Sequence, residues 1–267
     1  MPEHTRGTTA VRSDIAHATA STVTVHGLDL VGMLGEVSLG DFAYLELFGR
    51  LPDPRESRMF NAIVVALVEH GLTPSALVTR LTALGAPESL QSAVAAGLLG
   101  LGNTFVGTIE GAARLCQTRL PQPPEAGEDG PTDHEVEHIA RSILDESKAA
   151  GTLVPGLGHP VHKPVDPRAE KLFHISAELG LPPAPVRLMR TLSRLASEDR
   201  GRELPVNVTG AIGATCSQLG VPWEVARGLG VMGRAIGLVG HLLEERRTPI
   251  AATVWARAER EVNDTST

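Results

Sequence analysis

The sequence predicts an all-α fold, with at most a short β-strand or hairpin near the N-terminus. Hydrophobic residues make up 42% of the 267 residues but aromatic residues only 3%, so the core must consist of Ala, Leu and Val side chains. This composition favours closely packed helices, because sheets are usually richer in aromatic and β-branched residues. Residues 21–26, STVTVH, alternate enough to predict the one short strand.

Apolar residues at helical spacing predict the helices. Asp41 is the expected N-cap of a helix that ends before Leu51, and residues 59–68 are dense enough in apolar side chains for a largely buried helix. Further helices are expected at residues 73–84, 88–100, 133–150, 169–179 and 186–197. A Pro-, Gly- and acid-rich stretch at 121–132 lacks apolar periodicity and is expected to form a flexible linker.

The length of 267 residues suffices for one large domain or for one with a smaller subdomain. We predict a flexible N-terminal segment at residues 1–20, because these residues are mostly polar. A helical domain is expected at 21–255, with room for a small subdomain within about 133–225, and a C-terminal tail at 256–267.

Charge and cysteine content narrow the expected partners and location. The net charge of −7 argues against a nucleic-acid partner, since no basic stripe is present to neutralise phosphates. Cys116 and Cys216 lie in small apolar helical contexts and are expected to be buried free thiols, as is usual in a reducing cytoplasm. The N-terminus lacks the apolar run of a signal peptide, and no apolar stretch reaches about 18 residues, so we expect a soluble cytoplasmic protein with no membrane partner.

Residues 153–168, LVPGLGHPVHKPVDPR, have the composition of a ligand-binding loop. Gly156 and Gly158 allow a tight bend or a close approach to a ligand, because glycine takes positive φ without penalty. His159 would then lie on a proline-stiffened turn, and Arg168 would open the next helix with its guanidinium available for a carboxylate or phosphate. The alternative is a Pro-rich connector whose histidine merely caps a helix, and spacing alone does not decide between the two.

The stretch VPGLGHPVHKPVDPRAE resembles the catalytic-loop motif of the citrate synthase family, which has the form PGxGHxV/I, a short spacer and DPR. Its HPVHKP wording is most similar to the short citryl-CoA lyase branch, and other matching segments run from about Gly27 to Glu245. The resemblance implies a mainly helical citrate-synthase-like fold and a homodimer with its site near the subunit interface. It also implies a CoA thioester as substrate, with no permanently bound cofactor and no metal.

The resemblance assigns roles to individual residues. His159 matches the histidine that exchanges a proton with the keto or hydroxyl oxygen, and His70, in EHGLTPS, matches the histidine that binds the keto acid. Arg168 and Arg234 match arginines that hold substrate carboxylates. The loop that binds CoA through its backbone comprises Val154, Pro155, Gly156, Leu157 and Gly158. Without the resemblance, His70 would rather be a partner of the helix dipole.

Two family catalytic positions are substituted. Phe105 stands where the family has the histidine that hydrogen-bonds the thioester oxygen, and Thr209 stands where it has the enolising aspartate. A phenylalanine ring cannot donate a hydrogen bond, and a threonine hydroxyl does not titrate near neutral pH. Losing one oxyanion donor costs about 10²–10³ in rate and losing a general base about 10²–10⁴, so an ordinary citrate synthase is hard to defend.

Three functions fit this pattern. The first is a citryl-CoA lyase-like enzyme that cleaves or forms a C–C bond in a hydroxyacyl-CoA thioester, such as citryl-CoA to acetyl-CoA and oxaloacetate. In cleavage the departing enolate needs a proton donor rather than a strong base, so the loss of the aspartate would reduce the rate less. The second is a homologue acting on another acyl-CoA, and the third is a non-catalytic binder of CoA thioesters or carboxylates. We favour an enzyme, because the loop of His159 is intact; its partners would be a small acyl-CoA and a di- or tricarboxylate.

Overall fold

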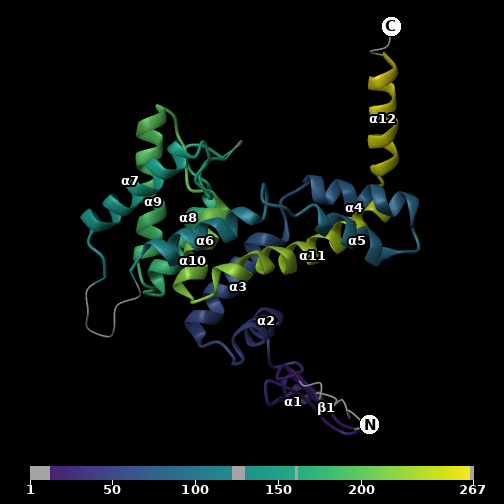
Figure 1. Ribbon diagram of the computed structural model, residues 1–267. Helices are drawn as coiled ribbons and strands as arrows, with labels where there is room; N and C mark the ends of the chain where they lie inside the picture. Colours follow the sequence, from purple (N-terminus) through teal and green to yellow (C-terminus); the bar gives the residue numbers. More distant parts are fainter. Residues whose placement is uncertain (1–12, 122–129, 160–161, 265–267) are drawn as a thin grey trace, which may run out of the picture. The chain divides into compact units, whose positions relative to one another are not determined.

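The structure is a computed structural model that describes residues 13–121, 130–159 and 162–264. Almost all regular elements are helices, which confirms the predicted all-α class (Figure 1). The chain divides into two compact units, Met1–Asn61 and Ala62–Thr267, and α3 (Pro54–Val68) contributes to both. The predicted boundaries at residues 20 and 255 and the subdomain within 133–225 stay predictions.

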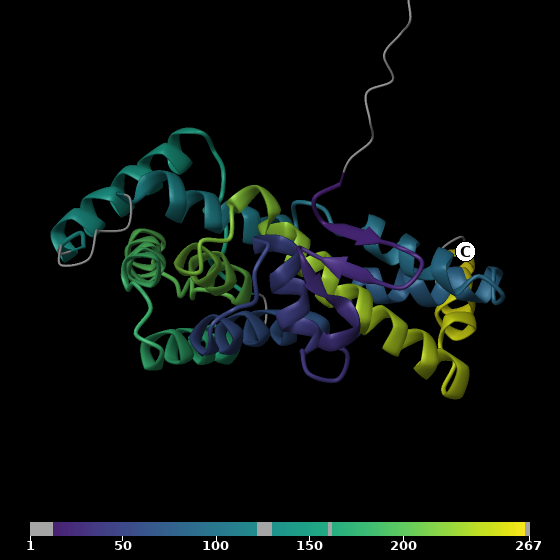
Figure 2. The same ribbon diagram turned by 90° about the horizontal axis from the view of Figure 1, so that it is seen from below.

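The first unit contains the only β structure among the described residues, a small antiparallel sheet that Figure 2 shows in purple. Its strands β1 (Ala16–Ala18), β2 (Val23–Val25) and β3 (Leu28–Asp29) follow the order of the chain, and Val25 pairs with both Ala16 and Leu28. The predicted strand at 21–26 therefore becomes the middle strand of three. A turn at His26 and Gly27, with φ of 47° and 80°, closes the β2–β3 hairpin.

Two helices complete this unit, α1 (Leu30–Met33) and α2 (Leu39–Phe48). The prediction that Asp41 caps α2 is wrong, because the helix starts earlier and Ser38 is its N-cap, accepting the Asp41 backbone N–H at 3.1 Å. The Asp41 carboxylate instead accepts hydrogen bonds from Ser57 at 2.7 Å and Asn61 at 2.9 Å. It thus ties the start of α2 to α3 within the unit.

The regular elements of the second unit, among its described residues, are helices. Beyond the end of α3 it comprises α4 (Pro74–Gly85), α5 (Leu90–Leu99), α6 (Gly107–Arg119), α7 (Asp133–Ala149), α8 (Pro167–Glu178), α9 (Ala184–Arg200), α10 (Val208–Gln218), α11 (Trp223–Arg247) and α12 (Ala251–Asp264). These bounds confirm the five predicted helices from residue 73 to residue 197 to within a few residues at each end.

Helix α10 packs against α6, α8 and α9 within the second unit (Figure 1). Small residues permit this packing: a Cβ atom at Gly213 would lie 2.6 Å from the Cβ of Ala112 on α6. Helix α11 then extends from α6 and α10 to α4 and α5. This arrangement brings the start of α10, the loop before α8 and one face of α11 into the same unit, and the predicted site residues lie on these segments.

Two further findings concern the cysteines and the possibility of a membrane-spanning helix. Cys116 and Cys216 are both buried free thiols, as predicted. Among the described residues, we find no helix with both the length and the apolar character needed to span a bilayer.

Candidate functional site

The loop that precedes His159 is fixed to the segment before α10 by backbone hydrogen bonds. The Gly158 N–H donates to the Pro205 carbonyl at 2.7 Å, and the Asn207 N–H donates to the Gly156 carbonyl at 3.0 Å. The Asn207 side chain also donates to the Gly158 carbonyl at 2.8 Å. The backbone of the predicted CoA-binding loop is therefore fixed by hydrogen bonds to the segment before α10.

Glycine is required at two positions of this loop. Gly156 and Gly158 have φ of +85° and +79°, in the left-handed region where other residues are strained. A Cβ atom at Gly156 would also lie 2.5 Å from the Cα of Gly210 on α10. The backbone of the loop thus touches the backbone of the helix, which only two facing glycines allow.

Asp166, at the end of the loop, is the anchor of the site. Its side chain is fully buried and accepts hydrogen bonds from Arg168 Nε at 3.1 Å, Arg168 Nη2 at 2.9 Å and the Val208 backbone N–H at 3.0 Å. Burial raises the pKa of Asp166, but these hydrogen bonds and the Arg168 charge outweigh it and hold the pKa below its usual value. Sequence reasoning missed this role; the signal was a carboxylate at the N-cap position before Pro167.

Arg168 joins the two predicted histidines. Its Nη1 lies 2.7 Å from His70 Nδ1, and its Nη2 lies 3.4 Å from His159 Nε2. The two imidazole rings face each other edge to face, with centroids 6.0 Å apart and an interplanar angle of 86°. The structure therefore brings together three of the predicted residues from α8, from the loop and from the turn after α3. Their predicted roles stay predictions.

The hydrogen bonds of these rings show which nitrogens face donors. The His162 backbone N–H donates to His159 Nδ1 at 2.9 Å, and Arg168 Nη2 lies 3.4 Å from His159 Nε2, so donors face both nitrogens of that ring. Because a guanidinium only donates, His70 Nδ1 accepts from Arg168 and the proton of neutral His70 is on Nε2. His70 is therefore a hydrogen-bond donor at Nε2, which suits an oxygen atom of a ligand.

Burial and neighbouring cations keep both histidines neutral. Burial lowers the pKa of His70, and the charges of Arg168 and Arg234 lower it further. Burial also lowers the pKa of His159, with His162 and Arg168 acting in the same direction and Asp166 opposing them. The ring of His162 lies over that of His159, with centroids 4.4 Å apart.

These shifts predict how stability depends on pH. A lowered pKa in the folded protein means that the unfolded chain binds protons more readily, so the stabilisation is present above the ordinary value of 6.5. We expect the free energy of unfolding to fall as the pH drops from 7 through 6.5 toward the lowered folded values. Urea unfolding of the protein and of a His70→Asn, His159→Asn double variant measures this, and an equal loss in both would contradict it.

Arg234 lies on α11 with only 11% of its side chain exposed. Burial lowers the pKa of Arg234, and the negative charge of Glu69 opposes this shift. The Glu69 carboxylate is 3.8 Å from Arg234 Nη1, too far for a hydrogen bond, and this Nη1 is buried without any hydrogen-bond partner. A buried guanidinium with an unsatisfied donor favours an anionic ligand.

The two substituted positions belong to a second group of contacts around Thr108. The Thr108 hydroxyl lies 2.8 Å from the Phe105 carbonyl oxygen and 2.9 Å from the Thr209 hydroxyl. Thr209 in turn donates to Asn207 Oδ1 at 2.6 Å. The Thr209 hydroxyl is thus engaged on both sides, and the Phe105 side chain is 47% exposed. Neither offers a base or a donor of the kind that the family has there.

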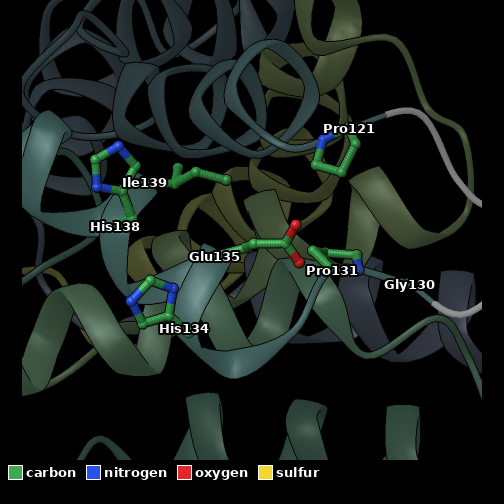
Figure 3. A pocket seen from close by; sticks show the side chains of 7 residues that line it. All are labelled: Pro121, Gly130, Pro131, His134, Glu135, His138 and Ile139. Atoms are coloured by element: carbon green, nitrogen blue, oxygen red, sulfur yellow. The ribbon is translucent and has the colours of Figure 1, made fainter.

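A cavity of about 590 Å³ lies elsewhere, at the start of α7 (Figure 3). It contains none of the predicted site residues, and its Glu135 carboxylate is committed to the cap of α7, accepting the Thr132 N–H at 2.7 Å. Within residues 13–121, 130–159 and 162–264, we find no group of three or more His, Cys, Asp or Glu side chains placed to hold a metal ion.

Fold and site together define a helical protein in which two histidines meet Arg168 at the end of a glycine loop, with a buried arginine on α11. The family model described as "Citrate synthase, C-terminal domain" matches residues 5–253. The chain therefore belongs to the citrate synthase family.

Solved structures and curated relatives agree with this assignment. The citryl-CoA lyase of Hydrogenobacter thermophilus is 31% identical, with a TM-score of 0.76 over 89% of this chain and 88% of that one. The ATP citrate lyase of Methanosaeta concilii, solved in complex with (3S)-citryl-CoA, shares the fold at 23% identity, with a TM-score of 0.74 over 91% of this chain and 40% of that one. The citrate synthase of Haloferax volcanii is 28% identical over 77% of this chain and 50% of that protein. The chain spans about half the length or less of the curated relatives it matches.

Proposed function

We propose that the protein is a citryl-CoA lyase-like enzyme that cleaves or forms the C–C bond of a hydroxyacyl-CoA thioester, such as citryl-CoA to acetyl-CoA and oxaloacetate. The observation that carries the proposal is the cluster in which Arg168 contacts both His70 and His159. Such a cluster supplies cationic and N–H donors for a keto-acid carboxylate and its carbonyl oxygen. The likeness to a citryl-CoA lyase over most of both chains supports the same conclusion.

In this proposal His159 handles the proton of the hydroxyl oxygen. In cleavage the hydroxyl gives its proton to the unprotonated ring nitrogen of neutral His159 as the C–C electron pair passes to the thioester enolate. When the bond forms, the imidazolium returns that proton to the carbonyl oxygen as the enolate carbon attacks the keto carbon. Burial and the Arg168 charge lower the pKa of His159 and so keep the ring neutral, ready to accept the hydroxyl proton.

The enolate released by cleavage needs one proton on carbon. The Thr209 hydroxyl is already donated to Asn207 at 2.6 Å, so we assign this proton to water. In the reverse direction water has to take that proton, because a neutral hydroxyl is a poor base. We propose cleavage as the direction of use, as in the citryl-CoA lyase that this chain resembles.

Incubating the purified protein with (3S)-citryl-CoA while following thioester loss and oxaloacetate formation tests the function. A parallel incubation with acetyl-CoA and oxaloacetate tests the reverse direction. We expect cleavage to be the faster reaction. Condensation without any cleavage would contradict the proposed direction.

A binder without turnover is the second candidate, because the Thr209 hydroxyl and the Phe105 ring offer neither a base nor an oxyanion donor. It requires that neither reaction proceeds while citrate or CoA still raises the melting temperature. A homologue that acts on a different acyl-CoA would instead turn over other thioesters at the same His159.

We further propose a cytoplasmic homodimer with no permanently bound cofactor. The two buried free thiols are typical of a reducing compartment. Ile236, Val239 and Leu243 recur on one side of α11 and are 46%, 46% and 56% exposed, which suits contact with a second copy.

A further inference from the structure

The end of α3 lies unusually close to α11. A Cβ atom at Gly237 would overlap the Val68 carbonyl oxygen, and one at Gly233 would lie 2.9 Å from the Cβ of Leu67. These two glycines are four residues apart and so form a groove on one side of α11, next to Arg234. The groove receives the backbone of α3 and thereby places Glu69, the next residue along the chain, against α11.

Glu69 is held in this position by four groups. Its Oε1 accepts the backbone N–H groups of His70 at 2.7 Å and Gly71 at 2.6 Å. The same oxygen lies 3.2 Å from His241 Nε2 and 3.8 Å from Arg234 Nη1. Burial raises the pKa of Glu69, but the hydrogen bonds from His70, Gly71 and His241 outweigh it and keep the carboxylate ionised. Glu69 is therefore an ordered negative charge beside the buried guanidinium.

We propose that Glu69 is the resident counter-ion of Arg234, a positioning residue that keeps the guanidinium compensated while leaving its Nη1 donor for a ligand carboxylate. This inference rests on the proposed function, since it takes the ligand to be a small di- or tricarboxylate. At 3.8 Å Glu69 neutralises Arg234 without forming a hydrogen bond to it. Because its own oxygen is fixed by two backbone N–H groups, it cannot move in to occupy the donor.

This arrangement has a consequence for affinity. When a ligand carboxylate binds Arg234, Glu69 becomes a like charge beside it and weakens binding. The Glu69 side chain is 51% exposed, so solvent screens the repulsion to the range of surface charge pairs. Release of a carboxylate product is therefore easier than from a bare guanidinium.

The charge is tested with Glu69→Gln, which keeps an oxygen for the His70 and Gly71 N–H groups. In calorimetric titrations with citrate, we expect this variant to bind about 1.5- to fivefold more tightly than the unaltered protein. Glu137→Gln, whose carboxylate pairs with Arg141 and Arg194 on exposed surfaces, is the matched control and should bind citrate unchanged. Equal or weaker binding by a folded Glu69→Gln would overturn the proposal and leave Glu69 as a cap of the turn alone.

A second measurement keeps the inference independent of the ligand. We expect the effects of Glu69→Gln and Arg234→Met on the urea midpoint to be non-additive, because each removes one charge of the same pair. Additive effects would overturn the pairing. If the unaltered protein binds no citrate while the two substitutions still couple, the proposed ligand class fails and the counter-ion pair stands.

Discussion

Replacing His159 by alanine is expected to lower kcat/KM for citryl-CoA cleavage by about 10²–10⁴-fold, the usual contribution of a general acid–base group. The reason is that His159, which lies 3.4 Å from Arg168 Nη2, is the group that exchanges a proton with the hydroxyl oxygen in the proposed reaction. Steady-state assays with (3S)-citryl-CoA measure the loss. Thr209→Ala should retain most of the cleavage activity, because its hydroxyl is committed to Asn207.

His174→Ala is the matched control for this experiment. His174 lies on the adjacent helix α8, 64% exposed, and contacts Glu178 at 3.0 Å. It should leave kcat/KM unchanged. If His159→Ala and His174→Ala were equally active, the imidazole beside Arg168 would have no part in the reaction, and the assignment of His159 as the acid–base group would be wrong.

Replacing Asp166 by alanine should destabilise the protein by about 3–5 kcal/mol, which is the typical cost of breaking a buried charge pair. Asp166 is fully buried and its loss leaves the Val208 and Arg168 N–H groups without acceptors. Because Arg168 is 25% exposed and can still reach water, we expect the lower end of this range. Denaturant unfolding measures the difference directly.

Glu146→Ala provides the comparison for an exposed pair. Glu146 contacts Arg119 at 2.7 Å with 60% of its side chain exposed, so its removal should cost far less than that of Asp166. Equal costs for the two substitutions would mean that Asp166 does not anchor the start of α10. If a folded Asp166→Asn variant no longer bound citrate, this would show that the Asp166 carboxylate positions Arg168 for the ligand.

The sequence predicted those features that depend on residue type and spacing along the chain. Helical periodicity identified five helices of the second unit, α4, α5, α7, α8 and α9, and the glycines of the loop were placed where positive φ is observed, at Gly156 and Gly158. The family motif also selected His70, His159 and Arg168, which the structure brings into contact. These signals come from residues close together in the sequence or from a complete family motif.

Contacts between distant segments were not predictable in the same way. Nothing local to Glu69 indicates that it faces Arg234, since the contact depends on two glycines on α11, 164 and 168 residues further along the chain. The hydrogen bond from the His162 backbone N–H to His159 Nδ1 depends on a local chain geometry that the sequence does not specify. The choice between Ser38 and Asp41 as N-cap depended on where α3 packs, because Asp41 is drawn to Asn61.

The contact between Gly156 and Gly210 links the dynamics of the loop to those of the core. Residues 208–216 of α10 are almost entirely buried, so the helix has little freedom to shift. A loop whose backbone rests on that helix moves with it as one rigid body. Amide hydrogens of Gly158 and Asn207 should therefore exchange through a shared opening event. If a ligand is enclosed at this loop, the segments that move to enclose it must be others than the loop itself.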